Sequence, residues 1–169
     1  MKIAFQMDPI QSVDINADSS FRLAEEAQAR GHELFYYSPD HLAYEEGRVT
    51  AKGYFFTVRR EQDNHADLSE FSHVDLADFD VVWLRQDPPF DMHYITSTHL
   101  LDRLMPQTLV VNDPFWVRNF PEKLLVLDFP DLTPPTTVAR DLDTIKAFKE
   151  KHGDVILKPL YGNGGAGVF

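Results

Sequence analysis

The sequence predicts an α/β protein: a doubly wound, mostly parallel sheet, followed by the beginning of a second domain. Up to about residue 112, short apolar β-prone segments alternate with segments of helical periodicity, as in parallel sheets with crossover helices. The hydrophobic fraction of 43% is enough for a genuine core. Beyond residue 120 there is a proline-rich connection and one strand–helix–strand pass, which is too short to bury its own faces.

The first part opens with an apolar strand, a loop and a helix. Asp18 or Ser19 suits the N-cap of that helix, and Gly31 suits the position just past its end. Residues 42–60 hold short β-prone runs with glycine turns, which predicts a β excursion at a sheet edge. The elements expected here are strands over residues 2–7, 32–38, 81–85 and 108–112, short strands within 42–60, and helices over about 20–30 and 93–105.

The second part begins with a short helix near Pro121, because proline fits the first turn of a helix. A strand over residues 136–140, a helix over about 143–152 closed by Gly153, and a strand over 154–160 should follow. We therefore expect an N-terminal domain over residues 1–120. Residues 121–169 are expected to be a linker and the beginning of a second domain, with the chain cut in mid-domain.

The last fifteen residues, VILKPLYGNGGAGVF, carry the strongest functional signal. They place four glycines within six positions, and Gly162, Gly164 and Gly167 fit the spacing G-x-G-x-x-G. Such a loop lets backbone amides approach an anion closely. No helix follows the glycines, as a dinucleotide fold requires, and the Gly-Lys-Ser/Thr of a Walker A loop is absent. Lys158 lies upstream of the loop, unlike the lysine of a kinase, so the remaining pattern is strand, Lys-Pro, glycine-rich hairpin, strand.

Composition excludes several classes of function. A net charge of -11 argues against nucleic-acid binding, so an anionic ligand must be held locally by a few cations and amides. The absence of cysteine excludes disulfides, thiolate metal sites and a cysteine nucleophile. The seven histidines show no zinc-ligand spacing, and no apolar run reaches transmembrane length. We expect a soluble, cytoplasmic protein with small-molecule substrates and neither nucleic acid nor membrane as partner.

The hairpin pattern resembles that of the ATP-grasp ligases, in which a glycine-rich hairpin folds over the triphosphate. The likeness extends along the chain. The segments MDPI, DSSF, LRQDPPFD, PEKL, DLTPPT and ILKPLYGNGGAGVF occur in order and together resemble the prokaryotic glutathione synthetase family. The resemblance covers essentially the whole chain, but only about the first half of a family member. Pro121 departs from the polar residue expected before the Glu-Lys pair.

This resemblance implies an ATP-dependent ligase that joins γ-glutamylcysteine to glycine through an acylphosphate, with residues 1–120 as a pre-ATP-grasp substrate domain. It implies Mg²⁺, with Mn²⁺ as a substitute, metal ligands outside this segment, and a homo-oligomer. It names no certain catalytic residue here, and the 169-residue piece alone is expected to be inactive. The ATP phosphates would be bound by Lys123, Lys158, Gly162, Gly164, Gly165, Ala166 and Gly167.

The dipeptide substrate is expected at the carboxyl ends of the first domain's strands. Arg85 ends one strand, and its guanidinium suits a bidentate grip on a carboxylate. Asp87 follows it, and Asp8, Asp18 and Ser19 belong to the first strand–helix connection. Purely structural roles stay open for each: the last two as helix caps, Asp8 as a turn residue, and Arg85 as the partner of a neighbouring acid.

Three alternatives also stay open. Another ATP-grasp carboxylate–amine ligase would share the phosphate machinery and differ in the loops of the first domain. A non-catalytic ligand-binding fragment is possible because half of the nucleotide cleft is not encoded in this segment. A dinucleotide dehydrogenase is the weakest alternative.

Overall fold

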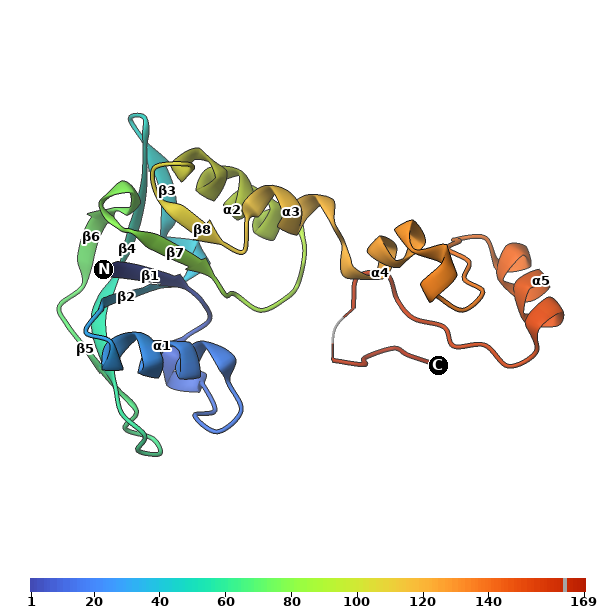
Figure 1. The fold of residues 1–169 in the computed structure, drawn as a ribbon, viewed down its shortest axis with the longest axis horizontal. Coiled ribbons are helices and arrows are strands. Elements are labelled where there is room, and N and C mark those ends of the chain that lie inside the picture. Colours follow the sequence, from blue (N-terminus) through green and yellow to red (C-terminus); the bar gives the residue numbers. More distant parts are fainter. Residues whose placement is uncertain (163) are drawn as a thin grey trace. The chain divides into compact units, whose positions relative to one another are not determined.

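A computed structural model describes residues 1–162 and 164–169, and its contacts divide the chain into two units, Met1–Asn119 and Phe120–Phe169 (Figure 1). The first unit is built on an eight-stranded sheet in the order β3-β4-β2-β1-β7-β8, with β5 and β6 also paired to β4. The strands are β1 (Lys2–Gln6), β2 (Glu33–Tyr37), β3 (Leu42–Glu45), β4 (Arg48–Val58), β5 (Ala66–Leu68), β6 (Ser72–Asp75), β7 (Val81–Leu84) and β8 (Leu109–Val111).

The sheet is mixed, so the prediction of a mostly parallel sheet was wrong for one half of it. Strands β2, β1, β7 and β8 are parallel neighbours, whereas β4 pairs antiparallel with β2, β3, β5 and β6. The reason is local, because β3 and β4 are joined by Glu46 and Gly47, which have φ of 49° and 89°. Two such residues form a tight hairpin turn, which only antiparallel strands can use. The expected β excursion at an edge is confirmed.

Helices cover both faces of this sheet. Helix α1 (Ser19–Ala29) lies on one side in Figure 1, and α2 (Met92–Leu101) with α3 (Pro114–Asn119) lies on the other. Each face has its own core: α1 packs on Ile3 and Phe5 of β1, and α2 belongs to the cluster that contains Ala4. Alternate residues of β1 therefore point to opposite cores, as the pleat of a strand requires.

Helix boundaries follow their caps. Asp18 caps α1 by accepting a 2.7 Å hydrogen bond from the amide of Phe21, and Gly31 follows the helix with φ of 75°, so both predictions are confirmed. Asp91 caps α2 in the same way. Helix α2 stops at Leu101 and continues as a 3-10 turn over Asp102–Leu104, where a single longer helix was expected. Helix α3 was not predicted.

The second unit contains α4 (Glu122–Leu125), two 3-10 turns (Val126–Asp128 and Pro130–Leu132) and α5 (Leu142–His152). Pro121 is the N-cap of α4, and Gly153 closes α5 with φ of 79°. The strands predicted over 136–140 and 154–160 are not formed in the described residues. One strand-like link exists there: Leu157 and Phe169 exchange both backbone hydrogen bonds, at 2.8 and 3.0 Å, which closes the glycine segment at its base.

A helix can span a membrane only if it is long and apolar enough. None of the helices in residues 1–162 and 164–169 is long and apolar enough to cross a bilayer.

Candidate functional site

A pocket of about 270 Å³ lies at the carboxyl ends of β1 and β7 in the first unit. This is the edge of a parallel arrangement where ligands commonly bind, because loops from neighbouring strands meet there. One wall is the connection from β1 to α1, which we call the pocket loop (residues 7–18). The pocket is lined by Met7, Asp8, Ser12, Val13, Asp14, Ala17, Asp18, Ser20, Arg85 and Asp87.

Arg85 is fixed by its backbone and by two hydroxyl groups. Its amide donates a 2.8 Å hydrogen bond to the carbonyl of Gln6, which extends the pairing of β1 and β7 by one residue. Its side chain donates from Nε to Ser20 Oγ at 3.1 Å and from Nη2 to Ser19 Oγ at 2.6 Å. Among the described residues Arg85 forms no ion pair. The alternative hypothesis, in which Arg85 forms an ion pair with a neighbouring acid, is therefore not supported by the described residues.

Three of the four acidic residues that line the pocket accept hydrogen bonds from backbone amides. Asp8 accepts a 2.6 Å hydrogen bond from the amide of Asp87, which ties the pocket loop to the segment after β7. Asp18 is occupied as the cap of α1, and Asp14 accepts from the amide of Asn16 at 2.9 Å. Because these carboxylates face backbone amides, the guanidinium remains the group best placed to meet a substrate carboxylate.

All five residues predicted for substrate binding lie together. Four line the pocket, and Ser19 holds the guanidinium of Arg85. The sequence did not single out Ser20, although its position beside Ser19 in the DSS segment could have indicated a second hydroxyl. It also missed Tyr94 of α2: burial raises the pKa of the Tyr94 phenol, and nearby Arg85 opposes that shift. Tyr94 therefore lies within electrostatic reach of the pocket.

The second candidate site is the glycine segment of the second unit. Gly164, Gly165 and Gly167 have φ of 58°, 76° and 69°, in the left-handed region that favours glycine. Successive residues in alternating right- and left-handed or turn conformations can turn their amides to one side and form an anion-binding concavity, and these glycines can supply the left-handed positions. Gly162 and Ala166 are also described, and both belong to this segment. Asn163, which completes the G-x-G-x-x-G pattern, lies outside the described residues.

The two predicted phosphate lysines differ in their surroundings. Lys123 of α4 donates from Nζ to the carbonyl of Pro159 at 2.8 Å and also to the carbonyl of Gly162, so it holds the start of the glycine segment. Lys158 is exposed and has no hydrogen bond or ion pair to any other described residue. A lysine beside the amides with no internal partner can reach an external anion without first breaking a contact.

A metal site needs several His, Cys, Asp or Glu side chains close together. Over residues 1–162 and 164–169, no group of three or more His, Cys, Asp or Glu side chains could hold a metal ion. The residues described here do not fit a resident Mg²⁺ site.

Together, the pocketed α/β unit and the glycine segment with its two lysines define a class, and comparison with known proteins agrees. Residues 122–169 match the profile described as "Prokaryotic glutathione synthetase, ATP-grasp domain", which makes this an ATP-grasp protein. Residues 1–118 match the profile of the "Prokaryotic glutathione synthetase, N-terminal domain". The chain belongs to the prokaryotic glutathione synthetase family.

Individual relatives support this assignment over the whole chain. The proteins named glutathione synthetase from Mesorhizobium japonicum and Brucella melitensis are each 55% identical over 169 residues, which is 100% of this chain and 54% of theirs. The glutathione synthetase of Vibrio parahaemolyticus is 42% identical over 170 residues, again 54% of its length. The chain thus spans about half the length of the curated relatives that it matches.

Proposed function

We propose that this chain is part of an ATP-dependent ligase that joins γ-glutamylcysteine to glycine and forms glutathione. The observation that carries the proposal is the ordered match of both units to the two domains of one ligase family. In the proposed reaction, ATP transfers its γ-phosphoryl group to the terminal carboxylate of the dipeptide. The glycine amine then attacks the acylphosphate, the new amide bond forms, phosphate leaves and ADP remains.

We assign the dipeptide to the pocket of the first unit and propose residues 1–120 as the substrate domain. Arg85 is held by two neutral hydroxyls, so its positive charge stays available for a substrate carboxylate. The carboxylate of Asp8 accepts from the amide of Asp87 and so ties the pocket loop to the segment after β7, and Asp18 and Ser19 order the start of α1. These groups bind and orient the substrate, which is what phosphoryl transfer chiefly requires of a protein.

We assign the ATP phosphates to residues 121–169, the linker and the beginning of the ATP-grasp domain. Lys158 would bind the phosphates through its exposed ammonium. Lys123 would orient the glycine segment through its two carbonyl contacts and add positive charge beside it. The amides of Gly162, Gly164, Gly165, Ala166 and Gly167 would donate to phosphate oxygens.

Other parts of the proposal concern the whole protein. Mg²⁺ or Mn²⁺ would accompany the nucleotide, with protein ligands outside the described residues. We place the reaction in the cytoplasm, where ATP is available, and propose a homo-oligomer.

The experiment is an assay of the complete gene product with ATP, Mg²⁺, γ-glutamylcysteine and glycine. Phosphate release and the mass of the product are both measured. We expect glutathione, with one phosphate released for each molecule formed. A panel in which the dipeptide and the amine are replaced one at a time tests the alternative of a different ATP-grasp ligase. If another pair turned over while γ-glutamylcysteine with glycine stayed inert, the substrate assignment would be wrong.

A further inference from the structure

We propose that His65 is a positioning residue for the dipeptide pocket: it fixes the pocket loop through the backbone carbonyl of Ile10, from a turn that lies outside the pocket. The proposal rests on the proposed function for its kinetic consequence, but its structural consequence can be measured independently. His65 lies between β4 and β5, some fifty residues from the loop in sequence.

The contact itself is short and buried. His65 is 7% exposed, and its Nε2 lies 2.6 Å from the carbonyl oxygen of Ile10. A carbonyl only accepts, so Nε2 carries the hydrogen and donates. The other ring nitrogen, Nδ1, is buried and has no hydrogen-bond partner among the described residues. Within the described residues, the imidazole ring of His65 therefore makes one hydrogen bond, and its partner belongs to the pocket loop.

Ile10 is the point at which the pocket loop is anchored. Its side chain is 2% exposed and belongs to the core beneath α1, and it begins the 3-10 turn Ile10–Ser12. Two residues before it, Asp8 holds the amide of Asp87, and two residues after it, Ser12 lines the pocket. A shift of the Ile10 backbone would therefore move both Asp8, which joins the pocket loop to the segment after β7, and the pocket-lining Ser12 that follows.

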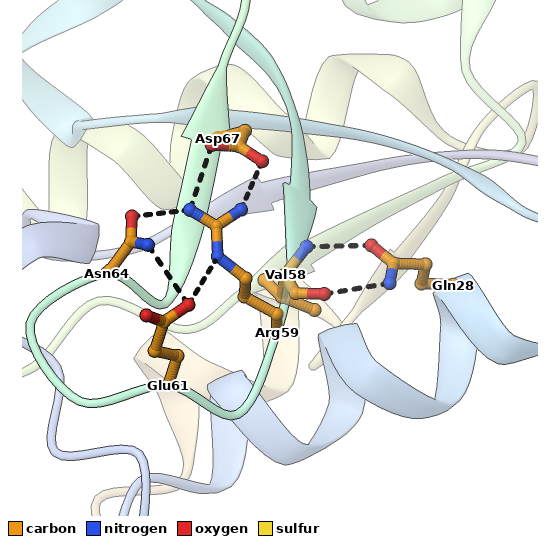
Figure 2. A network of polar contacts seen from close by, with 6 residues as sticks. All are labelled: Gln28, Val58, Arg59, Glu61, Asn64 and Asp67. Atoms are coloured by element: carbon orange, nitrogen blue, oxygen red, sulfur yellow. Dashed lines mark hydrogen bonds and ion pairs between the residues drawn. The ribbon is translucent and has the colours of Figure 1, made fainter.

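The turn that carries His65 is held by a network of side-chain hydrogen bonds (Figure 2). The guanidinium of Arg59 binds Asp67, Glu61 and Asn64, so it closes the turn from within. Next to it, Gln28 of α1 exchanges two hydrogen bonds with the backbone of Val58, at 2.7 and 2.8 Å.

Two more contacts join the turn to α1. Arg60 pairs with Glu25 through contacts of 2.9 and 2.7 Å. The ring of Phe21 meets the His65 ring edge to face, with centroids 5.7 Å apart. The turn and α1 thus form one support, from which His65 donates to the loop.

The test compares three variants of the complete gene product. His65→Leu removes the hydrogen-bond donor and introduces an apolar side chain of similar bulk. His65→Gln can restore a donor near the position of Nε2. Thr108→Val is the matched control, because Thr108 is fully buried and donates to a backbone carbonyl, that of Leu76 at 3.3 Å, in the core on the opposite face of the sheet.

Two readouts are measured, beginning with amide hydrogen exchange of residues 8–18. Exchange in the loop should rise about tenfold in His65→Leu, return toward wild type in His65→Gln and stay unchanged in Thr108→Val, as expected for loss of one buried hydrogen bond. In the ligase assay, KM for γ-glutamylcysteine should rise about tenfold in His65→Leu with KM for ATP unchanged.

The outcomes separate the two proposals. Unchanged exchange in His65→Leu, or an equal rise in Thr108→Val, would overturn the positioning role whatever the protein catalyses. A loosened loop with an unchanged KM for the dipeptide would also overturn it, because the loop would then not be part of the binding site. If the wild type made no glutathione but the exchange pattern held, the proposed function would fail while the contact of His65 with the loop would stand.

Discussion

The ammonium group of Lys123 donates a 2.8 Å hydrogen bond to the carbonyl of Pro159, the residue immediately after Lys158. Lys123 therefore binds the backbone of the glycine segment, whereas the ammonium group of Lys158 is exposed to solvent. The sequence predicts the same phosphate-binding role for both lysines, but their contacts differ. Substituting each lysine separately should therefore have different effects.

Replacing Lys123 by alanine should loosen the glycine segment even without nucleotide. The base of this segment is closed by the backbone pair of Leu157 and Phe169, and Lys123 bridges two carbonyls inside it. We expect the amides of that pair to exchange with solvent about tenfold faster, as for the loss of one exposed and one partly buried hydrogen bond. Lys146→Ala is the control, because that lysine is exposed and only pairs weakly with Asp143 at 3.9 Å. Equal exchange in both variants would contradict the prediction.

Replacing Lys158 by alanine should act on ATP rather than on the fold. An exposed ammonium without a partner in the described residues contributes little to stability, but a charged hydrogen bond to phosphate is worth about 1.5–3 kcal/mol. We therefore expect about 10- to 100-fold weaker ATP binding by calorimetry, with an unchanged Tm. Lys151→Ala, a substitution at another exposed lysine, serves as the control. An ATP affinity like that of the wild type would rule out the phosphate role.

Much of the first unit could be predicted from sequence because its signals are local. Apolar runs marked β1, β2, β7 and β8, and the cap of α1 was identified from Asp18 and Gly31. The antiparallel direction of the edge strands was not predicted, because hydrophobic periodicity identifies a strand but does not show which strand it pairs with. That half is antiparallel because β4 runs opposite to its neighbours β2, β3, β5 and β6, and the tight turn between β3 and β4 sets this direction for β3.

The site was predicted less completely, for a related reason. Arg85, Asp8 and Asp87 were predicted to lie together because they end or follow strands at the same edge of the sheet, and all three line the pocket. Ser20 contacts Arg85 and His65 contacts Ile10 across 65 and 55 residues of chain, and no spacing along the chain indicates which residue each of them meets. The strand expected over residues 154–160 failed similarly: its residues are β-prone, but the described part of that unit offers it a single paired residue.

Replacing Arg85 by lysine should weaken the dipeptide specifically. The guanidinium uses separate nitrogens for Ser19 and Ser20 and still has N–H donors on Nη1 and Nη2 for a carboxylate, which a single ammonium cannot reproduce. We expect KM for γ-glutamylcysteine to rise about 10- to 100-fold, with KM for ATP unchanged. Arg30→Lys, at the end of α1 in an exposed pair with Glu26, is the matched control. A change in KM for ATP of the same size would point to a general defect instead.

Gly167→Ala should disturb the glycine segment for two steric reasons. The residue has φ of 69°, and an added Cβ would lie 2.9 Å from Cγ of Pro159. The left-handed conformation alone costs a non-glycine residue about 1–2 kcal/mol. We expect KM for ATP to rise about tenfold or more. Gly31→Ala shares the positive φ but has open space and lies at the end of α1, so it should lower Tm without changing KM for ATP. The prediction fails if both variants bind ATP equally well.

The pair of Glu25 and Arg60 should make the first unit sensitive to acid. The Arg60 hydrogen bond lowers the pKa of Glu25, with a smaller contribution from Arg22, against an opposing effect of burial. Because the pKa is lower in the folded state, the stabilisation is fully present above the unfolded pKa of about 4.3 and is lost as the pH falls through the folded value. Glu25→Gln should therefore lower Tm by about 2–5 °C at pH 7, and the difference should shrink near pH 3.

Glu26→Gln is the natural comparison for this prediction, since Arg30 also lowers the pKa of Glu26. That pair is more exposed, with side chains 69% and 52% accessible, whereas the Glu25 side chain is only 16% accessible. Solvent screening should make the effect of Glu26→Gln the smaller of the two at neutral pH. Thermal unfolding of the wild type and both variants at pH 7 and pH 3 measures this. A Tm difference for Glu25→Gln that is as large at pH 3 as at pH 7 would show that lost packing, rather than lost charge, is responsible.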